Sequence, residues 1–241
     1  MKRLSSRERL REREPLRLET WLPMYARICD DFGFDKSRDL ESAQWLASQM
    51  GEDGARSLGQ TRRDFPQSVL VCGGSPGLAD ELSSLTARGY VIAADSATTV
   101  LMESNVQVDM IVTDLDGIVE DQIEANSRGA VVFVHAHGDN MRALARYAGR
   151  FTGPLVGTCQ CPPPPGIFNF GGFTDGDRAA CIAADLGAKN IFLAGFDFEH
   201  PSDKEGKSRE MKLRKLRWAK LVLDALAQEG ARLLPASEEV G

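Results

Sequence analysis

Two aspartates one residue apart, Asp114 and Asp116, end an apolar run in the segment VTDLDG. In an extended strand, residues i and i+2 point to the same side, so these two carboxylates would lie side by side. Like charges at this separation repel each other unless a positive charge lies between them. Carboxylate oxygens at this spacing suit Mg²⁺, which takes one or two carboxylates together with phosphate oxygens. The pair therefore predicts a divalent metal site.

Two further aspartates follow other apolar runs. Asp95, next to Ser96, ends the run YVIAADS, and Asp139 follows AVVFVHAHG. A single aspartate at a strand end is often the N-cap of the next helix, so for Asp95 this role and a role at a metal are both open. Asp139 adds another candidate carboxylate beside the pair.

A glycine-rich turn, CGGSPG, spans residues 72–77. Gly73 and Gly74 would let the backbone approach an anion, with Ser75 and the N–H groups of the next helix beside it. The Gly-Lys-Ser/Thr ending of a Walker A loop is missing, and a tight turn without a ligand explains the glycines equally well. Together with the four carboxylates, the turn suggests a metal-bound nucleoside triphosphate.

A second glycine-rich segment, NFGGFTDGDRA, leads into a helical pattern. Thr174 or Asp175 can cap that helix, and capping alone would explain the presence of either residue without a ligand. The functional interpretation places the backbone around Gly172 near a ligand. Phe170 or Phe173 would then stack on a flat ring.

The segment HAHGDN carries His135 and His137 on one side of a strand end. We favour hydrogen bonding of these rings to phosphate or substrate over zinc binding, because no third nitrogen or sulfur ligand is evident. Cys159 and Cys161 form a CxC pair without a second pair or a nearby histidine. Small buried thiols are therefore favoured over a zinc site at the CxC pair.

The elements that position these residues alternate between β-rich and helical patterns. The β-rich segments are nearly continuous in apolar residues, which is typical of parallel strands buried on both faces. The pattern predicts a three-layer, Rossmann-like α/β fold, with a mostly parallel sheet of about six strands and helices on both faces. Ligands of such sheets bind at the carboxyl ends of the strands, so the polar residues would meet at one rim. The expected strands lie within residues 68–74, 90–96, 109–116, 130–139, 153–160 and 190–198.

The N-terminal part of the chain lacks these β-rich segments. Residues 19–50 predict two helices, the first ending at Gly33 and the second capped by Asp39. The polar, glycine-containing segment that follows predicts a linker. We therefore divide the chain into an N-terminal helical region with linker, residues 1–67, and an α/β catalytic domain, residues 68–241.

Composition argues against several classes of protein. The net charge of −6 argues against a general nucleic-acid binder. Residues 1–17 carry seven Lys/Arg against three Glu and are most simply a solvated helix or arm, with a membrane or RNA contact as the alternative. A run of about 18 apolar residues and a secretory signal are both missing, so we expect no membrane association. The odd count of five cysteines suits a reducing cytoplasm. We expect small-molecule partners, and the oligomeric state, a homo-oligomer included, is left open.

The ordered set of motifs resembles a known family. ADSAT followed by VTDLDG is similar to segments of thiamine pyrophosphokinases. A closer match is the archaeal 6-hydroxymethyl-7,8-dihydropterin pyrophosphokinase family, which is related to the thiamine enzymes by fold. GGSPG, AADSA, TDLDG, HAHGDN, GGFTDGDRA and GFDF stand in the order and approximate spacing of that family's motifs. The resemblance covers roughly residues 68–226.

This resemblance implies transfer of a diphosphate from ATP to the hydroxymethyl group of a reduced pterin, releasing AMP. Such a product serves folate-type or tetrahydromethanopterin-type biosynthesis. By position, Asp95, Asp114 and Asp116 match the carboxylates that hold Mg²⁺ and the ATP phosphates. Asp116 or Asp139 is our candidate for accepting the hydroxyl proton. The residues that we expect at the nucleotide are Gly73, Gly74, Ser75, Asp95, Ser96, His137, Gly172, Thr174 and Asp175.

Other functions remain open from the sequence. Asp114-Leu115-Asp116 is also a DxD motif, which in nucleotide-sugar glycosyltransferases holds a metal on the sugar diphosphate. A thiamine diphosphokinase is a further alternative, although the β-sandwich domain that completes the vitamin site of those enzymes is not expected in this sequence. A third alternative is a nucleotide-binding regulator without catalysis.

Overall fold

The computed structural model describes residues 16–86, 88–200 and 208–238. Its centre is a sheet of seven strands in the order β5-β4-β3-β2-β1-β6-β7, and every neighbouring pair is parallel. The predicted α/β class and parallel sheet are confirmed. The strands are β1 Ser68–Cys72, β2 Tyr90–Ala94, β3 Met110–Thr113, β4 Val131–Ala136, β5 Leu155–Cys159, β6 Asn190–Ala194 and β7 Arg232–Pro235.

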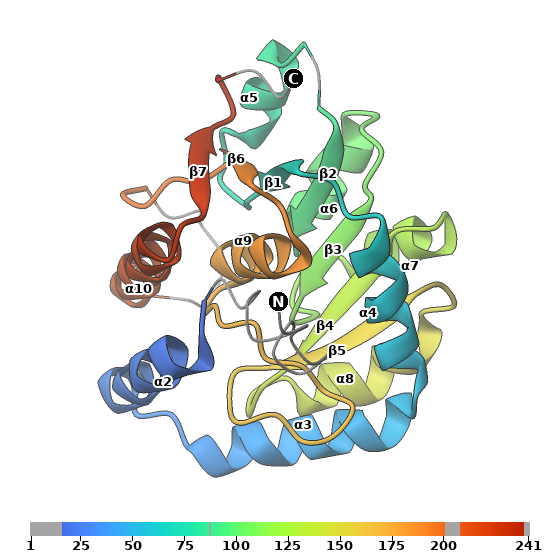
Figure 1. The fold of residues 1–241 in the computed structure, drawn as a ribbon, viewed down its shortest axis with the longest axis vertical. Coiled ribbons are helices and arrows are strands. Elements are labelled where there is room, and N and C mark those ends of the chain that lie inside the picture. The colour runs from blue at the N-terminus through green and yellow to red at the C-terminus, as the bar shows by residue number, and fades with distance from the viewer. Residues whose placement is uncertain (1–15, 87, 201–207, 239–241) are drawn as a thin grey trace, which may run out of the picture.

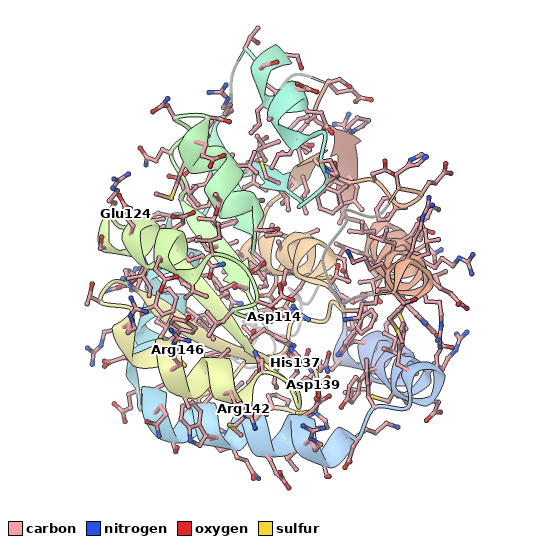
Figure 2. The ribbon with its side chains drawn as sticks, turned by 180° about the vertical axis from the view of Figure 1, so that it is seen from behind. Asp114, Glu124, His137, Asp139, Arg142 and Arg146 are labelled. Carbon is pink, nitrogen blue, oxygen red and sulfur yellow. The ribbon has the colours of Figure 1, made fainter. Side chains whose placement is uncertain are left out.

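Helices cover both faces of the sheet and make three layers (Figure 1). On the face turned to the viewer, α9 crosses β1, β2 and β3, while α3 and α4 pack on β5. The opposite face carries α5 to α8, which lie in front in Figure 2. The helices are α2 Leu18–Phe32, α3 Lys36–Met50, α4 Asp53–Arg63, α5 Leu78–Ser84, α6 Ala97–Glu103, α7 Val119–Ser127, α8 Met141–Tyr147, α9 Asp175–Leu186 and α10 Arg209–Gln228, with a short 3-10 helix η1 at Ala148–Arg150.

The seventh strand, β7, is missing from the sequence prediction of about six strands. It pairs with β6 at the edge of the sheet, and both of its end residues are exposed. An edge strand of four residues with exposed ends has no long apolar run to mark it. The six predicted strands, in contrast, are almost wholly buried, as expected for strands covered on both faces.

The prediction of a linker before the sheet is wrong, because most of that segment forms α4. Gly54 and Leu58 are its buried positions, one helical turn apart. Only one of the two is a large apolar residue, so the buried face of α4 produces no helical periodicity of apolar residues in the sequence. An ion pair between Arg62 and Asp185 also ties α4 to α9. The division of the chain at residue 67 stays a prediction.

The ends of the first two described helices follow local capping rules. Gly33 ends α2 in the left-handed conformation, with φ of 69°, as predicted. The predicted cap of the next helix is wrong: Asp35, not Asp39, accepts a hydrogen bond from the backbone of Ser37 at 2.9 Å. Asp39 lies one turn further on and is buried.

Close packing fixes α3 on the sheet. A Cβ atom on Gly157 of β5 would lie 2.6 Å from the sulfur of Met50 and 3.2 Å from Leu46. A Cβ atom on Gly138, just after β4, would lie 2.7 Å from the Cβ atom of Arg38. The N-terminal helices therefore contact the strand ends where ligands of parallel sheets bind.

The chain reverses its direction along the sheet between β1 and β6. Strands β1 to β5 follow one another outward, and β6 returns to the other side of β1. Helices α5 and α10, which follow β1 and β6, lie on opposite faces (Figure 1). This arrangement opens a crevice at the carboxyl ends of β1 and β6, the usual ligand site of doubly wound sheets.

None of the described helices is long and apolar enough to cross a membrane. The basic arm predicted over residues 1–17 falls almost entirely outside the described residues.

Candidate active site

Three carboxylates meet at the carboxyl ends of β2 and β3. Asp95 follows β2, and Asp114 and Asp116 follow β3. One oxygen of each lies within 4.8 Å of the others. We call these three residues the carboxylate cluster. In the described part of the chain they are also the one group of three or more potential ligands close enough to share a metal ion.

Asp95 is held by neutral donors from three directions. Its Oδ1 accepts hydrogen bonds from Thr113 Oγ1 at 2.8 Å, Gln122 Nε2 at 3.0 Å and the backbone N–H of Gly117 at 3.2 Å. A Cβ atom on Gly117 would lie 2.6 Å from Asp95 Oδ2. Glycine is therefore required after the DLD segment because the Asp95 carboxylate occupies the space of a side chain.

Unusual backbone conformations support the cluster. Asp95 has φ of 45° and Leu115 has φ of 67°, both in the left-handed region. This conformation costs a residue with a side chain about 1–2 kcal/mol. Leu115 is buried, and its N–H donates to Thr113 Oγ1 at 2.8 Å. The turn thus places the two flanking carboxylates close to Asp95 at the expense of local strain, which is typical of functional sites.

The tip of β4 supports Asp114. The ring of His137 contacts Asp114, with 3.4 Å between Nε2 and Oδ2. Asn140 donates to the backbone oxygens of Asp114 and His135, and accepts from the N–H of His137. Burial raises the pKa of Asp114, but the hydrogen bond and charge of His137 and the charge of Arg178 outweigh it and leave the pKa below its ordinary value. Asp114 is therefore a carboxylate.

Asp175, the first residue of α9, faces the cluster from the other side. Burial is the main cause that raises its pKa well above the ordinary value, and the charge of Asp114 adds to it. Arg178 offsets part of this effect through an ion pair with 2.7 Å between Nη1 and Oδ1. Carboxylates this close together repel one another, and oxygen ligands in such a group fit a divalent cation.

Asp139, expected as the fourth carboxylate, lies at the rim. Its side chain is 67% exposed and pairs with Arg38 at 3.5 Å. Figure 2 shows Asp139 and His137 in the same part of the molecule as Asp114, whereas Arg142 and Arg146 project from α8. Asp175, predicted only as a cap or nucleotide contact, takes the more central place.

These groups line one pocket of about 420 Å³. Its walls come from the ends of six strands, β1 to β6, and from α3, α9 and α10. Nearly every residue proposed from the sequence reaches it, although they are distant along the chain. The proposed residues that line the pocket are Gly73, Gly74, Ser75, Asp95, Ser96, Asp114, Asp116, His137, Asp139, Thr174 and Asp175.

Comparison with known proteins identifies the family. A family profile described as 6-hydroxymethylpterin diphosphokinase MptE-like matches residues 48–203. A 6-hydroxymethyl-7,8-dihydropterin pyrophosphokinase of Methanothermobacter thermautotrophicus is 45% identical over 228 residues, covering 89% of this chain and 97% of that protein. The chain belongs to the 6-hydroxymethylpterin diphosphokinase MptE-like family.

Two further relatives carry the same name. The protein of Pyrococcus furiosus is 40% identical over 226 residues, covering 89% of this chain and 96% of that protein. The protein of Methanocaldococcus jannaschii is 34% identical over 235 residues, covering 87% of this chain and 95% of that protein. The family resemblance drawn from the motifs is thus confirmed, and the comparisons do not favour a thiamine diphosphokinase or a glycosyltransferase.

In this family member the first glycine-rich turn serves packing as well as the pocket. A Cβ atom on Gly73 would lie 2.6 Å from the carbonyl oxygen of Gly195. The N–H groups of Gly73 and Ser75 donate to the backbone of Ala194 and Gly195, so they hold β1 against β6 rather than an anion. The backbone of Gly74 and the hydroxyl of Ser75 are the parts of the turn that remain for a ligand.

The second glycine-rich segment divides in the same way. Gly172 does not line the pocket, and a Cβ atom there would lie 2.3 Å from the Cα atom of Arg178. Thr174 is the N-cap of α9 and shares a capping box with Asp177. Phe173 lines the pocket, whereas Phe170 packs against Phe133 in the core.

The two histidines of HAHGDN have different surroundings. His137 lines the pocket, as expected. His135 is buried, with its Nδ1 3.0 Å from Thr158 Oγ1, and does not line the pocket. Burial, helped by the nearby charge of Arg178, lowers the pKa of His135 well below its ordinary value, so its ring is neutral.

The cysteines behave as small buried thiols. Cys159 donates to the backbone oxygen of Cys161 at 3.4 Å, and both side chains are buried. All five cysteines of the chain are free.

Basic residues of α10 contribute to the opposite wall. Lys212 and Lys215 line the pocket. Arg214, in contrast, pairs with Asp31 of α2 at 2.9 Å and lies over the ring of Phe32. One helix therefore brings two cations to the pocket and ties α10 to α2.

Sequence reasoning missed the wall built by the α2–α3 turn and by the residue after β5. The pocket-lining residues there are Phe34, Asp35, Arg38, Asp39 and Gln160. The only sequence signal near these residues was the predicted helix end at Gly33. Residues on a turn that precedes the sheet have no β-rich pattern that would associate them with the strand ends. Thr113, Gly117, Gln122 and Asn140, which position the cluster, were also missed.

Proposed function

We propose that the protein transfers the β,γ-diphosphate of ATP to the hydroxymethyl group of 6-hydroxymethyl-7,8-dihydropterin and releases AMP. The carboxylate cluster at the strand ends, inside a pocket large enough for small molecules, is the structural observation that carries this proposal. Family membership supports the choice of substrates.

We assign Asp95, Asp114 and Asp116 as the residues that hold Mg²⁺. Their oxygens lie within 4.8 Å of one another. Burial is the main cause of the raised pKa of Asp175, and the charges of these three carboxylates add to it. When bound, Mg²⁺ neutralises phosphate oxygens and orients the diphosphate for attack. Asp175, which forms an ion pair with Arg178, is a further candidate ligand.

The reaction breaks one bond and forms one. The hydroxymethyl oxygen attacks the β-phosphorus, and the bond from that phosphorus to the bridging oxygen of AMP breaks. The protein's part is to align the two substrates and to accept the hydroxyl proton. Asp116 and Asp139 are our candidates for the proton acceptor, because both line the pocket and both are exposed enough to exchange protons with water.

Neutral and basic groups would meet the phosphates. The backbone at Gly74 and the hydroxyls of Ser75 and Ser96 come from the turns after β1 and β2. Lys212 and Lys215 face them from α10. His137 and Thr174 complete the proposed nucleotide contacts.

We place the reaction in the cytoplasm. The support for this is that all five cysteines are free, as expected in a reducing compartment.

An incubation with ATP, Mg²⁺ and 6-hydroxymethyl-7,8-dihydropterin tests the proposal, with the nucleotide products separated by chromatography. AMP and the pterin diphosphate should form in equal amounts. Formation of ADP, or no consumption of ATP in the presence of the pterin, would show that the proposed reaction is wrong.

A further inference from the structure

The pocket extends to both sides of the carboxylate cluster. On one side the turns after β1 and β6 contribute Gly73 to Ser75 and Gly195 to Phe198. We call this the β1–β6 side. On the other side lies a wall that we call the α3 wall, made of Phe34, Asp35, Arg38, Asp39, Gln160 and Phe173.

The strand order separates the two sides. The cluster follows β2 and β3, while β5 lies beyond one side of it and β6 beyond the other. Five strand spacings, about 24 Å, separate β5 from β6. In-line displacement puts the attacking oxygen and the leaving oxygen on opposite sides of the phosphorus. The two substrates must therefore reach the cluster from opposite sides.

The β1–β6 side suits the nucleotide. It is the crevice where the chain reverses direction in the sheet, and its turns present the Gly74 backbone and the Ser75 hydroxyl. The rings of Phe196 and Phe198 line the same side. This leaves the α3 wall for the second substrate.

The α3 wall carries two carboxylates and one arginine, and Lys215 of α10 lies over its Phe173 ring, 5.8 Å from the ring centroid. Asp35 and Asp39 bring carboxylates to it, and its one arginine, Arg38, is engaged with Asp139 at 3.5 Å and with the backbone oxygen of Gly138 at 2.9 Å. A triphosphate would meet unfavourable charge here. An uncharged, flat ring with N–H donors on one edge would be complementary.

Asp39 is the most buried charged group of this wall, with 4% of the residue exposed. Its Oδ2 accepts from Tyr25 Oη at 2.8 Å and Gln160 Nε2 at 2.7 Å, and its Oδ1 accepts from the N–H of Gly138 at 2.7 Å. Burial, with the hydrogen bond to Asp39, raises the pKa of Tyr25 strongly, so the phenol keeps its proton and donates.

The count of donors leaves Asp39 incomplete. A carboxylate offers about four acceptor positions, and three are taken by neutral groups. Asp39 forms no ion pair with any lysine or arginine in the described ranges. A reduced pterin presents a 2-amino group and an N3–H on one edge, which are the donors that a buried carboxylate accepts.

Two aromatic rings line the same pocket as this carboxylate. The ring centroids of Phe34 and Phe173 are 6.5 Å apart, and the Phe32 ring lies near both, 5.2 Å from Phe34 and 5.4 Å from Phe173. The rings are tilted by 46° to each other, so they form an angled surface and not a slot. Such a surface packs against one face of a flat heterocycle.

We infer that the α3 wall is the acceptor subsite, where Asp39 accepts a hydrogen bond from the amino edge of the pterin and Phe34 with Phe173 contact the ring face. This inference rests on the proposed function. It adds the residues that select the pterin and directs the hydroxymethyl group toward the carboxylate cluster.

The test compares two rings that differ at the edge facing Asp39. 6-Hydroxymethylpterin carries an amino group at C2, and 6-hydroxymethyllumazine carries an oxygen there. Binding of each ring is measured by fluorescence titration without nucleotide, and binding of ATP with Mg²⁺ is measured separately by calorimetry. The wild-type protein should bind the pterin at least tenfold more tightly than the lumazine.

Asp39→Asn should lower pterin affinity at least tenfold and reverse the preference toward the lumazine, because the amide donates a hydrogen bond to the C2 oxygen. Its ATP affinity should stay within twofold of wild type. Glu41→Gln is the matched control, since Glu41 is exposed on the same helix and outside the pocket. It should change neither the ring preference nor ATP binding.

If Asp39→Asn does not fold, Phe34→Ala tests the acceptor subsite in its place. The Phe34 ring is partly exposed and makes none of the hydrogen bonds to Asp39. It should weaken both rings about equally, at least fivefold, with ATP affinity kept. Unchanged pterin affinity in both variants would overturn the inference, and so would a loss of ATP affinity in place of pterin affinity. The proposed function would still stand if the wild-type protein formed AMP. No AMP formation by the wild type would overturn the proposed function, and the binding titrations would still report on the wall.

Discussion

The carboxylate cluster and Asp39 are two acidic environments in one pocket, and their charges are compensated differently. In the cluster, carboxylates face one another, and Asp175 has a raised pKa chiefly through burial and then through the charge of Asp114. Around Asp39, three neutral donors surround a single carboxylate. The first environment brings several carboxylates close together, and the second leaves one acceptor position of a single carboxylate open. Acidic residues in one pocket can thus select a cation at one place and a neutral ring at another.

The largest effect should come from removing charge within the cluster. Asp114→Asn keeps the shape of the side chain but takes away a proposed metal ligand, so we expect AMP formation to fall by roughly 10²–10³-fold. Pterin binding without nucleotide should be unchanged. The control is Asp224→Asn, an exposed aspartate of α10 that does not line the pocket. A loss of only a few-fold in the Asp114 variant would contradict the proposed site.

A smaller loss should follow from moving the cluster without changing its charge. Gly117→Ala introduces a methyl group 2.6 Å from Asp95 Oδ2, so the carboxylate must shift. We expect Mg²⁺ affinity, measured by titration calorimetry with ATP present, to fall by roughly 10–100-fold. Gly59→Ala on α4 is the matched control, because nothing lies near its new methyl group. Equal behaviour of the two variants would show that Gly117 does not protect the cluster.

Changing the donors of Asp39 should produce a milder effect that spares the cluster. Tyr25→Phe removes one of three donors from the buried carboxylate, which should lower the free energy of unfolding by about 1–3 kcal/mol. Pterin affinity should change several-fold, with the KM for ATP unchanged. Tyr147→Phe on α8, whose ring packs beneath Arg150, is the control for loss of a phenol hydroxyl. An altered KM for ATP in the Tyr25 variant would contradict the claim that Asp39 and the carboxylate cluster serve different substrates.

The smallest effect concerns Asp31, which holds α2 against α10 beside the α3 wall. Hydrogen bonds from Trp218 and Arg214 lower its pKa. An ionised carboxylate whose pKa is lowered in the folded state stabilises the fold above its ordinary pKa, about 4. This stabilisation is lost as the pH falls through the lowered pKa. Asp31→Asn should therefore lower the Tm slightly at neutral pH, and the difference from wild type should vanish in acid. A difference that persists at the lowest pH would contradict this linkage.

The centre of the site was readable from the sequence because its chemistry is local. Asp114 and Asp116 are one residue apart after an apolar strand, and Asp95 follows the preceding strand. Parallel pairing then brings their oxygens together. The α3 wall has no such signal. Asp39 looked like a helix cap, and only packing of α3 on Gly138 brings it to the pocket.

Two glycines that we assigned to a ligand from the sequence make room for protein atoms instead, and one of them, Gly172, does not line the pocket. Gly73 and Gly172 were proposed to let the backbone approach a ligand, yet each leaves room for protein atoms, the oxygen of Gly195 and the Cα atom of Arg178. Sequence alone does not say which neighbour occupies the space of a missing side chain. The seventh strand was missed because it has only four residues and both of its ends are exposed. Helix α4 was missed because only one of its two buried positions is a large apolar residue.

The seating of α3 on Gly138 and Gly157 decides how the protein can be cut for experiments. A recombinant fragment starting at residue 68 would retain every aspartate of the cluster and all the strands. It would also uncover the apolar surface of β5 that Met50 and Leu46 now shield, and the backbone after β4 would no longer be held by Asp39. Such a fragment would be prone to aggregate, and any that stayed in solution should still take up nucleotide while having no place for its acceptor.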